Sequence, residues 1–296
     1  MSANDDARST LLIGANGGVG AAAARKMLDR GYRVTATVSR PERQKSFTHQ
    51  MPGCRRVIPL DLSDSAITER SVAEMVAEIT AAEGRLDAVI VCAAVSPFAP
   101  AETTSLEMFR RTMEINCVSH LAIYRAAMPA LRACRGRFVF TSSLSGRVAT
   151  PMMGAYVASK FALEGLADVM RQEAGAWGVE VILLQPGAID TPIVSRSRDA
   201  LAAAIPALPA EERLLYGKLY RQMQYRVVSA LDAGGLMPPE VVADAVIHAI
   251  ETPQPLPRYR IGADAEFLIG ASRTKSDREM DSLVLDIYGS SPVDGD

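Results

Sequence analysis

Short, continuously apolar runs alternate along this chain with longer helix-forming segments. A run that is apolar at every position is typical of a strand buried on both faces of a sheet. We expect such strands at Thr10–Ile13, Arg33–Val38, Arg56–Leu60, Ala88–Val91, Phe138–Thr141 and Val179–Leu184. Between them, helical spacing predicts helices at Val19–Arg30, Ala66–Glu83, Leu106–Leu131 and Ala155–Ala176. This alternation predicts an α/β fold with a doubly wound parallel sheet, the Rossmann arrangement.

The pattern contains no repeat, low-complexity tract or long linker, so we expect a single domain over residues 1–296 with a core over about 10–262. From Pro192 to Met237 we expect a loop followed by a helix, and then a helix through Glu251 and a last strand at Tyr259–Ile261. The polar, acidic end from residue 273 to 296 predicts a loose tail.

The composition argues against several classes of partner. Lys and Arg total 32 against 34 Asp and Glu, without basic runs, which argues against nucleic acid or an anionic membrane surface. No apolar run approaches the ~18 residues of a membrane span, and the first residues do not resemble a secretory signal. We therefore expect a soluble, cytoplasmic protein that acts on a small molecule.

The cysteines and histidines do not suggest a metal or redox centre. The four cysteines form no CxxC pair, and the three histidines are scattered singly. We expect reduced, buried thiols rather than a disulfide or redox role, and no metal site.

A glycine-rich turn, GANGGVG, follows the first strand and opens directly into a helix near Val19. Gly14, Gly18 and Gly20 lack β-carbons, so the backbone, including Asn16, is able to turn tightly and approach a pyrophosphate at the helix N-terminus. The turn predicts a dinucleotide cofactor; the alternative is a turn without ligand.

The end of the second strand bears on which dinucleotide binds. An acidic residue there would bind the adenosine ribose and repel a 2′-phosphate, but this strand ends in Ser39 and Arg40. A guanidinium makes bidentate pairs with phosphate, so NADP(H) is favoured, and NAD(H) stays possible. Alternatively, Arg40 is a solvated loop arginine.

Tyr156 and Lys160 lie four residues apart in a helical segment and therefore share one face. A nearby ammonium stabilises a phenolate, so we expect a lowered Tyr156 pKa and proton exchange with a substrate oxygen. Ser143, at the carboxyl end of the fifth strand, lies where such sheets place their ligands. Asn116 interrupts a helical stretch; it and Ser143 have structural alternatives of comparable weight.

These motifs together resemble the short-chain dehydrogenase/reductase family: GANGGVG, Asp61-Leu62, Asn116, Ser143, YVASK and PGAIDT stand in the family's order. The resemblance covers roughly residues 10 to 262. The FALEGLADVMRQE run after Lys160 is especially similar to the branch that contains hydroxysteroid and retinol dehydrogenases.

The resemblance implies catalytic roles for four residues. Tyr156 would be the general acid/base, Lys160 would hold the nicotinamide ribose and lower the Tyr156 pKa, and Ser143 would position the substrate oxygen. Asn116 would anchor the water of a proton relay. The family commonly forms dimers and tetramers through the helices that begin at Leu106 and Ala155, which implies a homodimer or homotetramer.

The resemblance also implies a set of cofactor contacts. Asp61 and Leu62 would meet the adenine, and the loop after the fourth strand, with Ala93, would lie on the adenosine side. Pro186, Gly187 and Ile189 would line the nicotinamide, and Thr191 would reach the carboxamide or diphosphate.

Two segments depart from the family pattern. Ile13 replaces a Thr before the first glycine, and Val91-Cys92-Ala93-Ala94 replaces Asn-Asn-Ala-Gly. The two sites are expected to be neighbours, so we interpret them as one compensated apolar exchange that affects adenosine-side binding but not the chemistry.

The segment from residue 192 to 237 corresponds to the family's variable substrate flap. Leu215, Leu219, Met223, Val227 and Leu231 recur there every four residues and give one apolar face. This favours a lid over a steroid, retinoid or lipid-like alcohol or ketone, although core packing or a subunit contact explains the stripe slightly better. Two other functions stay open: a non-catalytic NADP(H)-sensing binding protein, and a 3-oxoacyl-thioester reductase.

Overall fold

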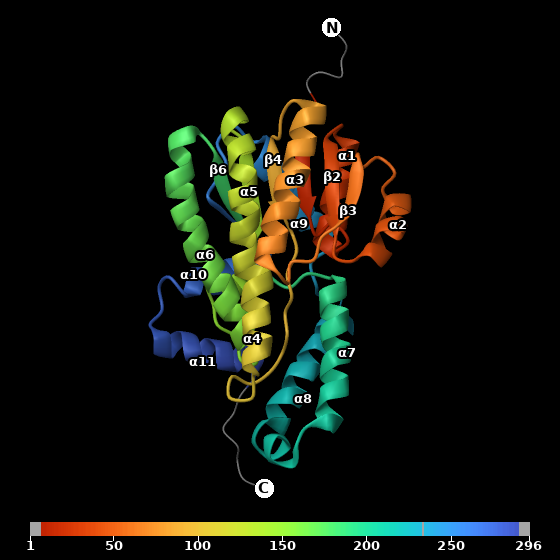
Figure 1. Cartoon of the computed structure of the whole chain (residues 1–296). Coiled ribbons are helices and arrows are strands. Elements are labelled where there is room, and N and C mark those ends of the chain that lie inside the picture. Colours follow the sequence, from red (N-terminus) through yellow and green to blue (C-terminus); the bar gives the residue numbers. More distant parts are fainter. Residues whose placement is uncertain (1–6, 233, 290–296) are drawn as a thin grey trace.

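The computed structural model describes residues 7–232 and 234–289 and contains a seven-stranded, fully parallel sheet (Figure 1). The strands are β1 (Ser9–Ile13), β2 (Arg33–Val38), β3 (Arg56–Pro59), β4 (Ala88–Val91), β5 (Arg137–Thr141), β6 (Glu180–Pro186) and β7 (Arg258–Ile261). Their order is β3-β2-β1-β4-β5-β6-β7. The predicted fold class is therefore confirmed.

Helices cover both faces of the sheet because the strands are apolar on both. On β1, Leu11 and Ile13 pack toward α3 (Ser65–Glu83), α5 (Ser119–Cys134) and α6 (Gly154–Ala174). The alternate residue Leu12 packs toward α1 (Gly18–Asp29), α2 (Pro41–Gln50) and α9 (Pro239–Glu251). Sequence analysis had not predicted α2, which begins at Pro41.

The strand order reverses between β1 and β4, and the chain segments that leave these two strands are adjacent there. Open α/β sheets bind ligands at such a switch point, outside the carboxyl ends of the strands. The helices α7 (Pro192–Ala207) and α8 (Ala210–Asp232) lie beyond that edge of the sheet (Figure 1).

The predicted helix Leu106–Leu131 consists of three parts. α4 (Leu106–Met113) passes into a π-helical turn at Glu114–Val118, and α5 continues from Ser119. Asn116 lies in this turn, so the expected interruption is a widened helical turn rather than a break. Isolated π-turns occur frequently at functional sites.

Two sequence expectations for the second half are wrong. Instead of a loop and one helix, α7 (Pro192–Ala207) begins immediately at Pro192 and α8 (Ala210–Asp232) follows. Proline at the first helical position favours this start. Of the supposed loose tail, Asp277–Tyr288 forms α11, which a capping box between Ser276 and Glu279 starts.

The helix α11 packs with α10 (Ala263–Ala271) in a small apolar cluster, so the packed part of the chain extends past residue 262. Val284 of α11 belongs to this cluster together with Leu268 and Ile269 of α10. Residues 290–296 of the expected tail lie outside the described residues. Within the described part, no helix has the length and apolar character that crossing a bilayer requires.

Candidate active site

The glycine turn between β1 and α1 presents bare backbone to the switch point. Gly14 has φ +82, and a β-carbon there would lie 2.7 Å from the backbone nitrogen of Ala93. A β-carbon on Gly20 would lie 2.3 Å from the carbonyl oxygen of Gly14. Gly17 precedes α1 and provides no side-chain cap, so the helix N–H groups are left for another acceptor.

The two segments that depart from the family pattern are neighbours, as expected. Ile13 pairs with Val91 in the sheet, and the Cys92 N–H donates to the Ile13 carbonyl at 2.9 Å. The turn also has a polar support that sequence analysis missed: the Gly14 N–H donates to the Thr37 hydroxyl of β2 at 3.1 Å.

The side chain of Asn16 fixes the end of β2. Its Oδ1 accepts from the Ser39 N–H at 3.1 Å, and its Nδ2 donates to the Ser39 hydroxyl at 3.3 Å. Arg40, next in the chain, is exposed and precedes the first turn of α2. The glycine turn and the Arg40 segment are thus held together by one asparagine.

Tyr156 and Lys160 lie on one face of α6, and the Lys160 Nζ is 5.7 Å from the centre of the Tyr156 ring. The Lys160 side chain is 1% exposed and donates to the Thr141 carbonyl of β5 at 2.8 Å. Burial lowers the pKa of Lys160 to about 8, against the opposing effect of the Glu164 carboxylate.

The expected lowering of the Tyr156 pKa is not found. Burial raises this pKa above its ordinary value because it disfavours the phenolate, and a hydrogen bond with Ser143 opposes the effect. Ser143 itself is buried and starts a short 3-10 turn at Leu144–Gly146 by accepting from the Ser145 N–H at 3.1 Å. Tyr156 and Ser143 are therefore paired, as their proposed roles require.

Asn116 is fully buried, and its carboxamide binds the chain that follows β4. Its Oδ1 accepts from the Val95 N–H at 2.9 Å, and its Nδ2 donates to the Val95 carbonyl at 2.8 Å. The same Nδ2 donates to the Ser159 hydroxyl of α6 at 3.0 Å. Its side chain thus joins the β4 loop to the helix that carries Tyr156 and Lys160.

A cavity of about 310 Å³ brings most of these groups together. Its lining includes Gly18, Val19, Gly20, Ser143, Tyr156, Lys160, Pro186, Gly187, Ile189 and Thr191. The other predicted residues do not line it: Gly14, Asn16, Ser39, Arg40, Asp61, Leu62, Ala93 and Asn116. Asp61 is exposed and accepts from the Ser63 N–H, and the Leu62 carbonyl accepts from the Ser119 hydroxyl.

The apolar stripe of α8 divides between packing and cavity. Leu215 is 50% exposed, and Leu219 packs at the margin of a cluster with Leu201 of α7. Met223 and Val227 touch the same cluster and also line the cavity. Packing alone therefore accounts for Leu219, whereas Met223 and Val227 both pack in the cluster and face the cavity.

The cavity residues that sequence analysis missed include Arg226, Asp264 and Tyr288. The Asp264 Oδ2 accepts from the Ala188 N–H at 2.8 Å, so it supports the loop after β6. Tyr288 reaches the cavity from the end of α11. The Ser276 to Glu279 capping pattern, followed by apolar residues at helical spacing, would have predicted that helix.

The four cysteines differ in how deeply they are buried. All four cysteines are free, although only Cys117 is buried and the others are partly buried. Cys92 lines the cavity, and burial raises its pKa to about 11. Among the described residues, no cluster of three potential metal-ligating side chains occurs.

Comparisons with known proteins agree with this geometry. A family model described as short chain dehydrogenase matches residues 8–202. The chain is 26% identical over 281 residues to the NADPH-dependent 3-dehydrocapnine reductase of Ornithobacterium rhinotracheale, covering 93% of this chain and 95% of that protein. It is 29% identical over 264 residues to the 17-beta-hydroxysteroid dehydrogenase type 1 of Mus musculus, and the match covers 86% of this chain and 73% of that protein. A solved short chain dehydrogenase from Burkholderia cenocepacia J2315 in complex with NADP has a TM-score of 0.67 at 21% identity, and the match covers 97% of this chain and 99% of that one.

Proposed function

Because the chain belongs to the short-chain dehydrogenase family, we propose that it transfers a hydride between NADP(H) and the carbonyl or alcohol carbon of a bulky, largely apolar substrate. The observation that carries this proposal is the cavity itself. It brings the glycine turn, Ser143, Tyr156 and Lys160 to one space although they come from distant parts of the sequence.

The residues present fit a dinucleotide. The turn from Gly14 to Gly20 has no room for β-carbons at its closest backbone approaches, and the N-terminus of α1 faces the same cavity. Its free N–H groups and the helix dipole favour a pyrophosphate there. Pro186, Gly187 and Ile189 would then line the nicotinamide, and Thr191 would lie beside them.

Arg40 supports NADP(H) over NAD(H). It is exposed just after β2, where the Asn16 side chain holds the preceding residue, and neither of the two residues that directly follow the strand, Ser39 and Arg40, is acidic. A guanidinium at this position suits a 2′-phosphate. One relative is named as NADPH-dependent, and one structural neighbour was solved with NADP.

The proton chemistry follows from the Tyr156 and Ser143 pair. When bound, NADPH would supply the hydride. Ser143 would hold the substrate oxygen by a hydrogen bond, and Tyr156 would give that oxygen its phenolic proton. Burial raises the pKa of Tyr156, and the protonated phenol is the form that donates a proton to the substrate oxygen during reduction. Lys160 would contact the ribose.

The lining of the cavity supports an apolar substrate. The apolar residues that line it come from the loop after β4, the residue before α6, the helices α7 and α8, and the segment between α8 and α9: Phe98, Met153, Ile193, Val194, Met223 and Leu236. Such walls contribute about 25 cal/mol per Å² of apolar surface that a ligand buries. A relative that is named as a hydroxysteroid dehydrogenase is consistent with a ligand of this kind.

Exposed apolar side chains support the expected homo-oligomer. Phe161 and Val169 on α6 are each more than 40% exposed, and Leu106 and Phe109 lie exposed on α4. Apolar residues gathered on helices of one face suit a subunit contact. Light scattering coupled to size-exclusion chromatography would report a dimer or tetramer, and a monomer would contradict this part of the proposal.

The function is tested by NADPH oxidation with a panel of apolar ketones, using wild type, Tyr156→Phe and Tyr32→Phe. Tyr32 is a buried tyrosine outside the cavity, whose hydroxyl contacts Arg8 and Glu251. We expect turnover by the wild type and Tyr32→Phe and a loss of at least about 100-fold in Tyr156→Phe. Cofactor binding without turnover of any ketone or alcohol would instead support an NADP(H)-sensing protein.

A further inference from the structure

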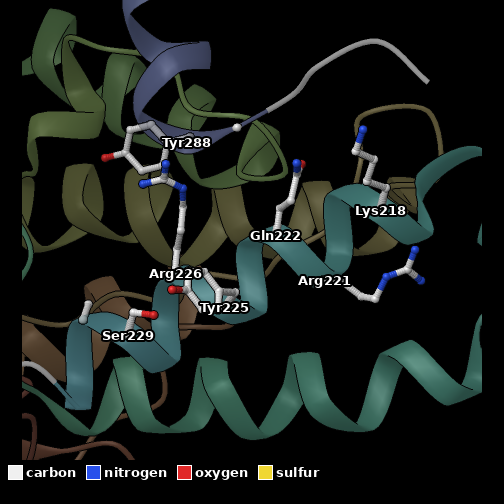
Figure 2. Close-up of a pocket in the computed structure, with 9 residues that line it drawn as sticks. Lys218, Arg221, Gln222, Tyr225, Arg226, Ser229 and Tyr288 are labelled. Atoms are coloured by element: carbon white, nitrogen blue, oxygen red, sulfur yellow. The ribbon is translucent and has the colours of Figure 1, made fainter. Parts of the chain in front are cut away.

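A second, open groove of about 710 Å³ lies along α8 next to the end of α11 (Figure 2). α8 contributes Lys218, Arg221, Gln222, Tyr225 and Arg226, and Tyr288 closes one end. The described lining contains three cationic side chains and no carboxylate. The groove is therefore basic in a chain whose overall charge is close to neutral.

Three hydrogen-bond donors form a row in this groove. Lys218, Gln222 and Arg226 are spaced four residues apart on α8 and project to the same side of the helix, with Arg226 directed at Tyr288 (Figure 2). An ammonium, a carboxamide and a guanidinium in one line suit an acceptor that carries several oxygens.

Arg226 forms no ion pair within the described part of the protein, and the Asp264 carboxylate that lines the same cavity accepts from the Ala188 N–H. Arg258 and Arg260 form ion pairs with glutamates, but no described carboxylate lies within ion-pair distance of Arg226 or Lys218. The Arg226 guanidinium lies 5.5 Å from the centre of the Tyr288 ring. This cation–π contact orients the guanidinium and leaves its N–H groups free to bind an anion.

The groove and the catalytic cavity share part of their lining. Arg226, Ala230 and Tyr288 line both. The cavity that holds Tyr156 is also lined by Met223 and Val227, which are apolar and flank Arg226 in the sequence of α8. A ligand long enough to extend from Tyr156 to Arg226 would therefore lie in a cavity that has apolar side chains beside the guanidinium.

We propose that the substrate carries an oxyanion at the end away from its reacting carbon, and that Arg226 binds this group with help from Lys218 and Gln222. The inference rests on the proposed function, since it names the substrate class of the same site. Two parallel N–H groups of a guanidinium match the oxygens of a carboxylate, phosphonate or sulfonate. The lining of the groove includes no residue of the glycine turn or of α2, where the cofactor phosphates are expected.

The test is a calorimetric titration of the full chain, with and without NADP⁺, using three ten-carbon probes: decanoate, decylphosphonate and the neutral decanamide. The variants are Arg226→Gln, Arg226→Lys and Lys218→Gln. Arg273→Gln is the matched control, because Arg273 is exposed, lies beyond α10 and lines neither space.

In the wild type we expect at least one anion to bind about tenfold or more tightly than decanamide, and added salt should reduce this ratio. Arg226→Gln should bring the ratio below about twofold, and Lys218→Gln should reduce it by less. Arg226→Lys should retain an intermediate ratio, because it keeps the charge and loses the planar fork. Arg273→Gln should match the wild type. The better of the two anions identifies the head group.

Equal binding of decanoate, decylphosphonate and decanamide, a preference that survives Arg226→Gln, or no binding of either anion at millimolar concentration would overturn the inference. This assay needs no turnover. Tyr156-dependent reduction of neutral ketones without any preference for anions would contradict the inference and leave the proposed function intact. Selective anion binding without NADPH oxidation would support the inference about Arg226 and contradict the proposed reductase function.

Discussion

Asn116 holds both backbone polar groups of Val95: its Oδ1 accepts from the Val95 N–H at 2.9 Å, and its Nδ2 donates to the Val95 carbonyl at 2.8 Å. Because Asn116 is fully buried, Asn116→Ala would remove these bonds and the one to Ser159 without letting water replace them easily. We expect a loss of about 2–4 kcal/mol in the free energy of unfolding, measured with urea.

The control is Asn16→Ala, since Asn16 also makes two side-chain bonds to a single residue, Ser39, but in an exposed place. Its expected cost is below about 1 kcal/mol. Equal and small costs for the two variants would mean that Asn116 does not hold the β4 loop, and a role confined to anchoring water would then be favoured.

A comparison of Gly14→Ala with Gly31→Ala distinguishes the cost of a strained backbone from the cost of a steric clash with a neighbouring segment. Both have positive φ, but a β-carbon on Gly31 meets nothing within 4 Å, whereas one on Gly14 would lie 2.7 Å from the Ala93 nitrogen. Gly31→Ala should cost about 1–2 kcal/mol in unfolding free energy and leave NADPH binding intact. Gly14→Ala should cost more and abolish NADPH-induced fluorescence change. Matching effects would argue against a tight turn at this site.

Lys160 should make the free energy of unfolding depend on pH in the alkaline range. Its pKa is lowered from 10.5 to about 8, so between these values the unfolded chain binds more protons than the folded chain, and stability rises with pH. The unfolding free energy of the wild type minus that of Lys160→Met should therefore increase by about 3 kcal/mol from pH 8 to 10.5. Urea titrations at several pH values measure this difference, and parallel curves for the two proteins would refute the buried charge.

Arg40 should determine the choice between the two nicotinamide cofactors. Arg40→Ser would remove a charge-assisted contact with the 2′-phosphate worth about 1.5–3 kcal/mol, so kcat/KM for NADPH should fall about 10- to 100-fold. The value for NADH should change little. Arg43→Ser, an exposed arginine in the first turn of α2, is the matched control. Unchanged kcat/KM for NADPH in Arg40→Ser would show that Arg40 is a solvated loop residue.

The sheet could be predicted from sequence because its signal is local. Strands such as Ala88–Val91 are apolar at every position, and burial on both faces demands that pattern. The pairing of Tyr156 with Lys160 could be predicted for the same reason, since helical spacing alone places them on one face. The raised pKa of Tyr156 could not be predicted, because it depends on how deeply segments that are distant in the sequence bury this side chain.

The parts of the site that sequence reasoning missed come from tertiary packing. Arg226, Asp264 and Tyr288 reach the cavity only because α8, α10 and α11 pack around the carboxyl edge of the sheet. No motif marks them, and Tyr288 lies in a segment whose acidic composition suggested a loose tail. Its helix depends on a capping box and a modest apolar face against Leu268, which composition alone does not reveal.

Hydride transfer assisted by Tyr156 is tested most directly by following the hydride with an isotope label. NADPH deuterated at the transferred C4 position is incubated with an apolar ketone, and the alcohol product is analysed by mass spectrometry for wild type and Tyr156→Phe. We expect one deuterium on the carbinol carbon with the wild type, and product formation at least about 100-fold slower with Tyr156→Phe although NADPH still binds. A product without deuterium, or one formed equally fast by both proteins, would contradict hydride transfer assisted by Tyr156.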